Sequence, residues 1–254
     1  MNMSKIFQKL LLFILALTFV SFAQEMNPDA GKLYNEGNSL LKAGNYKGAI
    51  GSYDKALAIE KDYRIYYQRG IAQKKSSDLE GSKSSFEECI KLKSDFEAGY
   101  NALGGVYFSM GRYQDAINNF EKVITLSNNA SVTKKVKKNL SLAYTKLGTD
   151  EVGKGNSQKA IEYLNKAVEN DNYDAAYLSL AKLYSELGDW DKCITAAENA
   201  LKYKSKITLG GPEYYMGLSY KGKGNTAKAK EMFEKAKSDP TYRKNAEYQL
   251  GLLQ

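Results

Sequence analysis

The feature that most constrains this chain is a helix–turn–helix pattern that recurs along its length. Residues 97–130 carry two helical patterns on either side of Gly111, the first at Tyr100, Leu103, Gly104 and Tyr107 and the second at Ala116, Ile117, Phe120 and Val123. The same turn position recurs at Gly44, Ser77, Gly155 and Gly188. One such hairpin cannot bury its apolar face alone, so it needs copies stacked on both sides.

The residues of this unit resemble the tetratricopeptide repeat (TPR). The signature positions of that family fall on Tyr100, Leu103, Gly104, Tyr107, Ala116, Phe120, Val123 and Asn128. The resemblance implies an all-α chain folded as a right-handed α-solenoid of about six stacked repeats with a C-terminal capping helix. We place the repeats approximately at residues 30–62, 63–96, 97–130, 141–173, 174–207 and 210–242, and the capping helix at 241–254. Gly37, Gly70 and Gly104 are expected to let paired helices approach closely.

An insertion separates the third repeat from the fourth. Residues 131–140, SVTKKVKKNL, contain no glycine or proline, and apolar residues continue at helical spacing beyond them. We expect a helix extension and not a loop. It carries a cluster of four lysines, Lys134, Lys135, Lys137 and Lys138, which is either a solvated helix face or a docking point for an acidic partner or an anionic surface.

The N-terminus has the pattern of an export signal. Lys5 and Lys9 precede an uncharged run that ends at Ala23, with small residues suited to cleavage there. We therefore predict a signal peptide at 1–23, a flexible lead-in at 24–29 and a mature chain in the periplasm. The alternative is an uncleaved anchor that tethers the array, the one case in which we expect membrane contact.

Composition argues against catalysis. The chain has no histidine, which removes the commonest general base and metal ligand. No phosphate-binding glycine loop or paired CxxC is present, and we assign the oxygen-rich residues 170–174 to an interhelix turn in preference to a calcium site. We expect no enzymatic activity, no cofactor and no metal. Cys89 and Cys193 occupy helix-packing positions three repeats apart and are predicted to be free, buried thiols.

The charge of the chain does not indicate nucleic-acid binding. The formal charge is +8, and about +6 remains after signal removal. Lysines alternate with acidic residues, which is typical of a mixed solvated surface, and no nucleic-acid-binding signature is present.

The resemblance implies a concave groove lined by the first helix of each repeat. The corresponding positions are Tyr34, Asn38, Tyr67, Lys74, Asn101, Phe108, Lys146, Leu178, Lys182, Tyr214 and Lys221. Aromatic, amide and cationic side chains together suit an extended peptide. Some TPR domains clamp a C-terminal carboxylate, but here Tyr34 takes the place of the first clamp lysine and only Asn38 and Asn101 match, so we expect no such clamp.

The function that these residues favour is a non-catalytic scaffold that binds a protein or peptide segment, in cell-envelope assembly. The alternative is an accessory protein that binds or processes cell-wall glycan, because tyrosine rings stack on sugars as well as on peptides.

Overall fold

The computed structural model describes residues 25–253, and every regular element in that range is an α-helix. The helices are α2 (Pro28–Lys42), α3 (Tyr46–Ile59), α4 (Tyr63–Lys75), α5 (Leu79–Leu92), α6 (Glu97–Ser109), α7 (Tyr113–Leu126), α8 (Ala130–Gly153), α9 (Ser157–Asn170), α10 (Asp174–Glu186), α11 (Trp190–Lys202), α12 (Gly210–Gly222), α13 (Thr226–Ala236) and α14 (Arg243–Gly251). The prediction of an all-α solenoid is confirmed. The predicted signal peptide, residues 1–23, lies outside the described residues.

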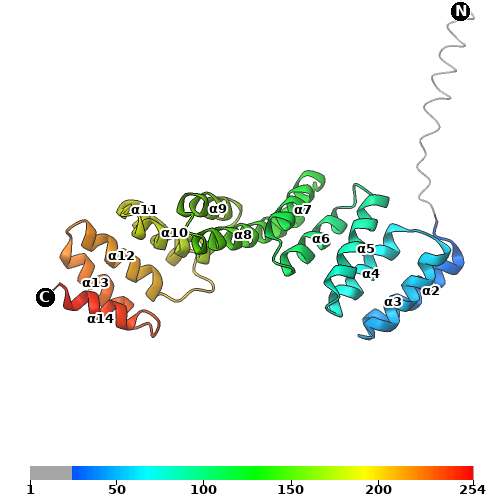
Figure 1. Ribbon diagram of the computed structural model, residues 1–254, viewed down its shortest axis with the longest axis horizontal. Coiled ribbons are helices and arrows are strands. Elements are labelled where there is room, and N and C mark those ends of the chain that lie inside the picture. The colour runs from blue at the N-terminus through cyan, green and yellow to red at the C-terminus, as the bar shows by residue number, and fades with distance from the viewer. Residues whose placement is uncertain (1–24, 254) are drawn as a thin grey trace, which may run out of the picture.

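Successive helices pair and then stack into one elongated array, with α2 and α14 at opposite ends (Figure 1). Each pair, such as α2 with α3 or α4 with α5, also contacts the next pair through its second helix. The first helices contact one another as well, α2 with α4 and α4 with α6, and further along α8 with α10 and α10 with α12. We call the surface formed by these first helices the inner face.

Inside each hairpin a small residue on the first helix faces a large side chain on the second. A Cβ at Gly37 would lie 2.5 Å from the Tyr53 ring, and one at Gly104 would lie 2.7 Å from the Phe120 ring. The same arrangement recurs at Gly70 with Phe86, Gly148 with Leu164 and Gly217 with Phe233. These glycines therefore allow the close helix approach that the sequence predicts.

The turn within each hairpin requires a left-handed residue. Five of these residues are glycines with φ between +73° and +79°, namely Gly44, Gly111, Gly155, Gly188 and Gly224. In the second repeat Ser77 takes the same conformation, with φ of +67°. Serine bears a Cβ that disfavours this region, so the second turn is strained in a way that the others are not.

Helix α8 is the exception in length. It has 24 residues, whereas α4, α6, α10 and α12 have 13 each. Its first half is the predicted extension, and that segment is helical as expected. In Figure 1, α8 runs between the group α2–α7 and the group α9–α14 and contacts both α7 and α9. The insertion therefore joins two stacks of hairpins.

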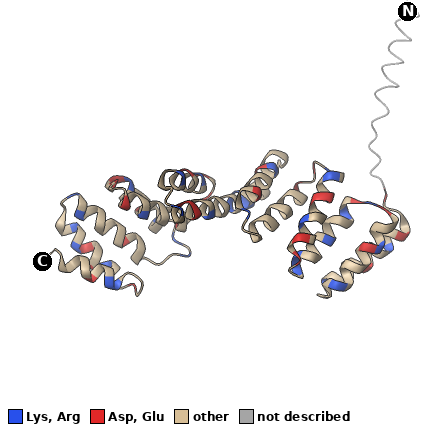
Figure 2. Cartoon of the chain, viewed as in Figure 1, with Lys and Arg blue, Asp and Glu red and all other residues tan. Residues whose placement is uncertain are grey.

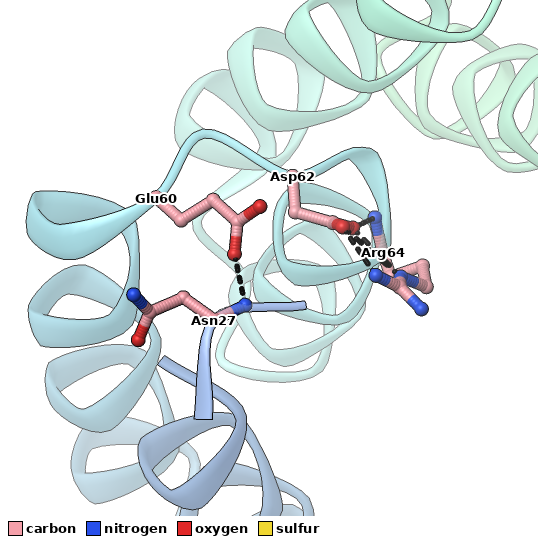
Figure 3. A network of polar contacts seen from close by, with 4 residues as sticks. All are labelled: Asn27, Glu60, Asp62 and Arg64. Carbon is pink, nitrogen blue, oxygen red and sulfur yellow. Dashed lines mark hydrogen bonds and ion pairs between the residues drawn. The ribbon is translucent and has the colours of Figure 1, made fainter. Parts of the chain in front are cut away.

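The first helix begins within the predicted lead-in. The Asn27 side chain accepts hydrogen bonds from the backbone N–H groups of Asp29 and Ala30, so α2 begins at Pro28 and not after residue 29. The Asn27 N–H in turn donates to Glu60 Oε2 at 2.6 Å, beside the ion pair of Asp62 with Arg64 (Figure 3). The start of the array is thus held to the turn between α3 and α4.

Two close contacts shape the C-terminal repeats. Helix α12 begins at Gly210, two residues before Pro212, because Gly210 lacks a side chain that would overlap Asp239. Trp190 does not only pack within its own hairpin, since a Cβ at Gly222 of the next pair would lie 2.5 Å from its ring. The last helix, α14, buries Ala246 against the core of α13, which is how a capping helix closes a solenoid.

The remaining surface is mixed in charge, with lysines and acidic residues interspersed over the helices (Figure 2). Cys89 and Cys193 are both free and buried, as predicted. Among residues 25–253, none of the helices combines the length and the apolarity needed to span a bilayer.

Candidate functional site

Three predicted groove residues meet in one pocket on the inner face. Lys74 of α4 and Asn101 and Phe108 of α6 line a cavity of about 380 Å³. Its remaining lining residues are Ala102, Gly105 and Ser109 of α6, Phe120 of α7, and Asn139 and Leu142 of α8. We call this cavity the α6–α8 pocket. It combines one cation, two amides and apolar surface, which is the mixture that binds and orients a peptide.

The position of Lys74 depends on a glycine. A Cβ at Gly105 would lie 3.0 Å from Lys74 Nζ, so the absence of a side chain there lets the ammonium group approach α6. Part of the Lys74 side chain is exposed to solvent. The protein atoms around the rest of it desolvate the ammonium group and lower its pKa. A partly desolvated cation of this kind gains from an anionic ligand.

The far wall of the pocket comes from the long helix. Asn139 and Leu142 lie on α8 with a spacing of three residues, and Lys135 and Lys146 continue the same stripe one turn away on either side. Both lysines are exposed. Lys146 therefore lies next to the pocket that holds Lys74 and Asn101, although it does not line the cavity.

A second cavity lies one repeat earlier on the inner face. It has a volume of about 530 Å³ and is lined by Asn38, Leu41 and Lys42 of α2 and by Gln68 and Lys75 of α4. We call it the α2–α4 pocket. Lys74 and Lys75 are consecutive residues of α4, so both pockets border the C-terminal end of that helix.

The predicted aromatic groove residues are largely engaged in packing. The Tyr34 ring lies 6.1 Å from Tyr53, and Tyr67 lies 5.1 Å from Phe96 and 5.7 Å from Phe86. Burial raises the pKa of Tyr67. The hydroxyl of Tyr53 donates to Asn38 Oδ1 at 2.8 Å, so that amide is also partly occupied. These contacts hold consecutive helices together.

The predicted groove residues of the C-terminal repeats are occupied too. Tyr214 contacts the rings of Tyr215, Phe233 and Tyr242 at 5.5 to 5.8 Å. Lys221 donates to Gln249 of α14 at 2.8 Å, and Lys182 lies 3.9 Å from Glu186. Leu178 faces Gly211 of the next pair, where a Cβ would lie 3.1 Å away. None of these four residues lines the α6–α8 pocket.

The lining residues that sequence reasoning missed include Lys42, Gln68, Lys75, Asn139 and Leu142. The positional rule of the repeats assigns one inner-face set per helix, and these residues lie at other positions. The signal for Asn139 and Leu142 was their spacing of seven and four residues from Lys146, which places all three on one face of a continuous helix.

The oxygen-rich segment 170–174 has a structural role. Asp174 is fully buried, and its Oδ2 accepts hydrogen bonds from the backbone N–H groups of Ser205, Lys206 and Ile207 at 2.6 to 3.1 Å. Burial opposes ionisation of this carboxyl, but these donors and the N–H of Ala175 outweigh it and hold its pKa below the ordinary value. Within the described residues no group of three acidic, cysteine or histidine residues could hold a metal ion.

Comparison with protein families covers almost all of the described array. Tetratricopeptide-repeat family models match residues 30–63, 63–96, 95–172, 145–206 and 213–241. The matched ranges follow the helix pairs from α2 to α13, including the pair that contains the long α8.

Two curated proteins illustrate the relationship. DnaJ homolog subfamily C member 3 from Homo sapiens is 25% identical over 205 residues, which is 78% of this chain and 41% of that protein. Small glutamine-rich tetratricopeptide repeat-containing protein 2 from Mycosarcoma maydis is 29% identical over 107 residues, 42% of this chain and 30% of that protein. The chain thus spans less than half the length of these curated relatives.

A solved structure shares the fold. The crystal structure of YrrB, described as a TPR protein with an unusual peptide-binding site, is 22% identical and covers 78% of this chain and 96% of its own, with a TM-score of 0.51. Proteins with this fold act as scaffolds for protein interactions. The repeat matches, the stacked helix pairs and the small-residue contacts within each hairpin agree, and the chain is a member of the tetratricopeptide-repeat family.

Proposed function

We propose that the protein is a non-catalytic scaffold that holds an extended segment of a partner protein on its inner face, with the α6–α8 pocket as the anchor. The observation that carries this proposal is the convergence of Lys74, Asn101 and Phe108. Their positions within the repeats predicted a groove, and these three side chains, from two different helices, line one cavity.

The chemistry of the pocket suits a peptide backbone. Asn101 on α6 and Asn139 on α8 offer amide donors and acceptors from opposite walls, which can pair with the unpaired N–H and C=O groups of an extended chain. Phe108 and Leu142 supply apolar surface for one side chain of the partner. An extended protein segment can use the cation, the two amides and the apolar surface of the site together.

The glycan alternative rested on tyrosines of the groove. Tyr34, Tyr67 and Tyr214 each pack against a core aromatic ring, and all three are partly buried. A sugar needs an open ring face on which to stack. This arrangement supports a protein partner over a glycan.

We also propose that residues 1–23 direct export and that the mature chain acts in the periplasm during cell-envelope assembly. The support is the pattern of Lys5 and Lys9 followed by the uncharged run to Ala23. The test is the intact mass of the protein from fractionated cells. A mass that begins at Gln24 in the periplasmic fraction is expected, and a cytoplasmic protein that retains residues 1–23 contradicts the proposal.

The main test is affinity capture from the native envelope with the chain Gln24 to Gln254. We compare it with the double variant Asn101→Ala and Asn139→Ala, and with Asn118→Ala, an exposed asparagine on α7 that lines neither pocket. The double variant is expected to lose a partner that the control retains, with unchanged helical content and melting. Equal capture by all three proteins contradicts the α6–α8 pocket as the anchor.

A further inference from the structure

The two inner-face pockets share a property that two other cavities among the described residues lack. The lining of the α2–α4 pocket and of the α6–α8 pocket contains Lys42, Lys74 and Lys75 but no aspartate or glutamate. By contrast, a cavity of about 320 Å³ between α9, α10 and α11 includes Asp191. A similar one between α11, α12 and α13 includes Glu198, Glu213 and Glu231. The two inner-face pockets therefore carry positive charge that no acidic residue of their linings neutralises.

The lysines in and beside these two pockets also lack ion pairs, unlike Lys182 further along the inner face. Within residues 25–253, Lys42, Lys74 and Lys75 form no ion pair, and the same holds for Lys135 and Lys146. Lysines on second helices commonly do, as Lys166 does with Glu162 at 2.9 Å and Lys235 with Glu231 at 2.7 Å. Five unpaired cations on one face produce a positive field that a complementary ligand neutralises.

The inserted helix contributes to this field. On α8, Lys135, Asn139, Leu142 and Lys146 follow one stripe, so two cations flank the amide and the apolar residue that line the pocket. Lys135 and Asn139 belong to the insertion itself. The insertion therefore adds both lining and charge at the junction where the two stacks of hairpins meet.

We propose that the partner segment is acidic, with carboxylates that contact the lysines of both inner-face pockets and one apolar side chain held between Phe108 and Leu142. This inference rests on the proposed function of the inner face. The carboxylates belong to side chains of the segment and not to a chain terminus. A clamp for a terminal carboxylate needs a cation at the position of Tyr34, which is uncharged and packs on the Tyr53 ring.

The length of the segment follows from the spacing of helices. Packed helices lie about 10 Å apart and an extended chain advances about 3.3 Å per residue. The centres of the α2–α4 and α6–α8 pockets are two such spacings apart, so roughly six residues separate contacts in the two pockets. A segment of about nine residues is therefore long enough to reach from α2 to the α8 stripe.

The test is fluorescence anisotropy of the chain Gln24 to Gln254 with labelled peptides of about nine residues. The first peptide repeats Glu-Glu-Leu and has an acetylated N-terminus and an amidated C-terminus. The second replaces each glutamate by glutamine, and the third replaces each leucine by serine. We expect the first peptide to bind at least about tenfold tighter than either of the others, with an affinity that falls as salt rises.

Matched variants separate a local contact from the overall charge. Lys42→Gln with Lys75→Gln, and separately Lys74→Gln, should each weaken binding of the acidic peptide by about tenfold. The control is Lys55→Gln with Lys122→Gln, which removes two exposed charges from α3 and α7 outside both pockets. A loss of affinity in the control equal to that in the first double variant overturns the proposal.

The outcomes also distinguish this inference from the proposed function. Equal binding of the glutamate and glutamine peptides overturns the acidic partner but leaves peptide binding on the inner face intact. Failure of the acidic peptide to bind also overturns the acidic partner. The scaffold function is then tested separately, by affinity capture from the envelope. Another contrary result is a captured partner that needs Asn101 and Asn139 but none of the three pocket lysines, Lys42, Lys74 and Lys75. That result overturns the acidic partner and supports the scaffold function.

Discussion

The first helices of the two halves of the array carry similar residues at two repeat positions, but these residues have different surroundings. Lys74 and Asn101 line an open pocket, and Lys146 lies exposed beside it. In the C-terminal half Lys221 donates to Gln249 and Tyr214 contacts three rings. The repeat positions of Lys74 and Asn101 thus line a pocket in one half, whereas in the other half Lys221 and Tyr214 at these positions contact neighbouring elements.

The difference arises from what lies over each face. In the C-terminal half, α14 and the turn before it place Gln249 and Tyr242 against α12. In the N-terminal half, the long α8 forms the opposite wall of the pocket and leaves the inner face of α6 open. Repeat position alone therefore does not identify a binding residue in a solenoid, because the neighbouring element decides whether the side chain is free.

The largest expected effect is on the loop that supports the C-terminal half. Asp174→Ala removes the acceptor for three backbone N–H groups of residues 205–207 and should lower the free energy of unfolding by about 3 kcal/mol. Urea denaturation measures it, and hydrogen exchange should localise the loss to α10–α12. Asp171→Ala, which removes no side-chain hydrogen bond, is the control. An equal loss in the two variants contradicts the assigned role.

The same carboxylate predicts a pH dependence confined to that half. Because the pKa of folded Asp174 lies below its ordinary value of 3.8, its stabilising contribution is complete above that value and is lost as pH falls through the folded pKa. Hydrogen exchange at decreasing pH should show α10–α12 opening before α2–α7. In Asp174→Asn this difference between the halves should be much smaller, and an unchanged difference would assign it to other groups.

The next effect distinguishes a residue that packs in the C-terminal half from a residue that we expect to bind the peptide in the N-terminal half. Tyr214→Ala removes contacts with three aromatic rings and should cost about 2 kcal/mol in the free energy of unfolding, without weakening peptide binding. Asn101→Ala, an exposed residue on α6, should weaken binding and change stability by less than about 0.5 kcal/mol. Thermal unfolding measures the stability of both variants, and fluorescence anisotropy measures their affinity for the peptide. Weaker binding in Tyr214→Ala would extend the binding surface to the C-terminal half.

Two adjacent glycines on α6 sharpen the comparison within one helix turn. Gly104→Ala places a methyl group 2.7 Å from the Phe120 ring and should cost about 1 to 2 kcal/mol in the free energy of unfolding. Gly105→Ala meets only the flexible end of Lys74, so it should leave stability unchanged or raise it through helix propensity, while it displaces the ammonium and weakens binding of the acidic peptide. Chemical denaturation and anisotropy distinguish them. The reverse pattern would place the pocket on the other side of α6.

The smallest effect concerns the turn of the second repeat. Ser77→Gly relieves the left-handed strain and should raise the free energy of unfolding by about 0.5 to 1 kcal/mol. Gly111→Ala, at the equivalent turn with open space around it, should lower it by about 1 kcal/mol. Chemical denaturation compares the two, and no gain in Ser77→Gly would mean that its side chain stabilises the turn.

Much of the fold was predictable because the same local interactions recur in every repeat. The turn glycines, the small residues opposite Tyr53, Phe86 and Phe120, and the helical insertion before Leu140 follow from periodicity and glycine conformation alone. The binding face was predictable only in part. Lys74, Asn101 and Phe108 converge as expected, but Tyr34, Tyr67 and Tyr214 are engaged by neighbouring rings.

The sequence by itself determined that this chain forms stacked helix pairs, since each hairpin exposes an apolar face that only another hairpin can cover. It also determined where the turns lie and which small residues let helices approach. Only the tertiary structure decided which inner-face residues stay free. That outcome depends on α8 and α14, elements far apart in sequence whose positions set whether an inner-face side chain meets solvent or another part of the chain.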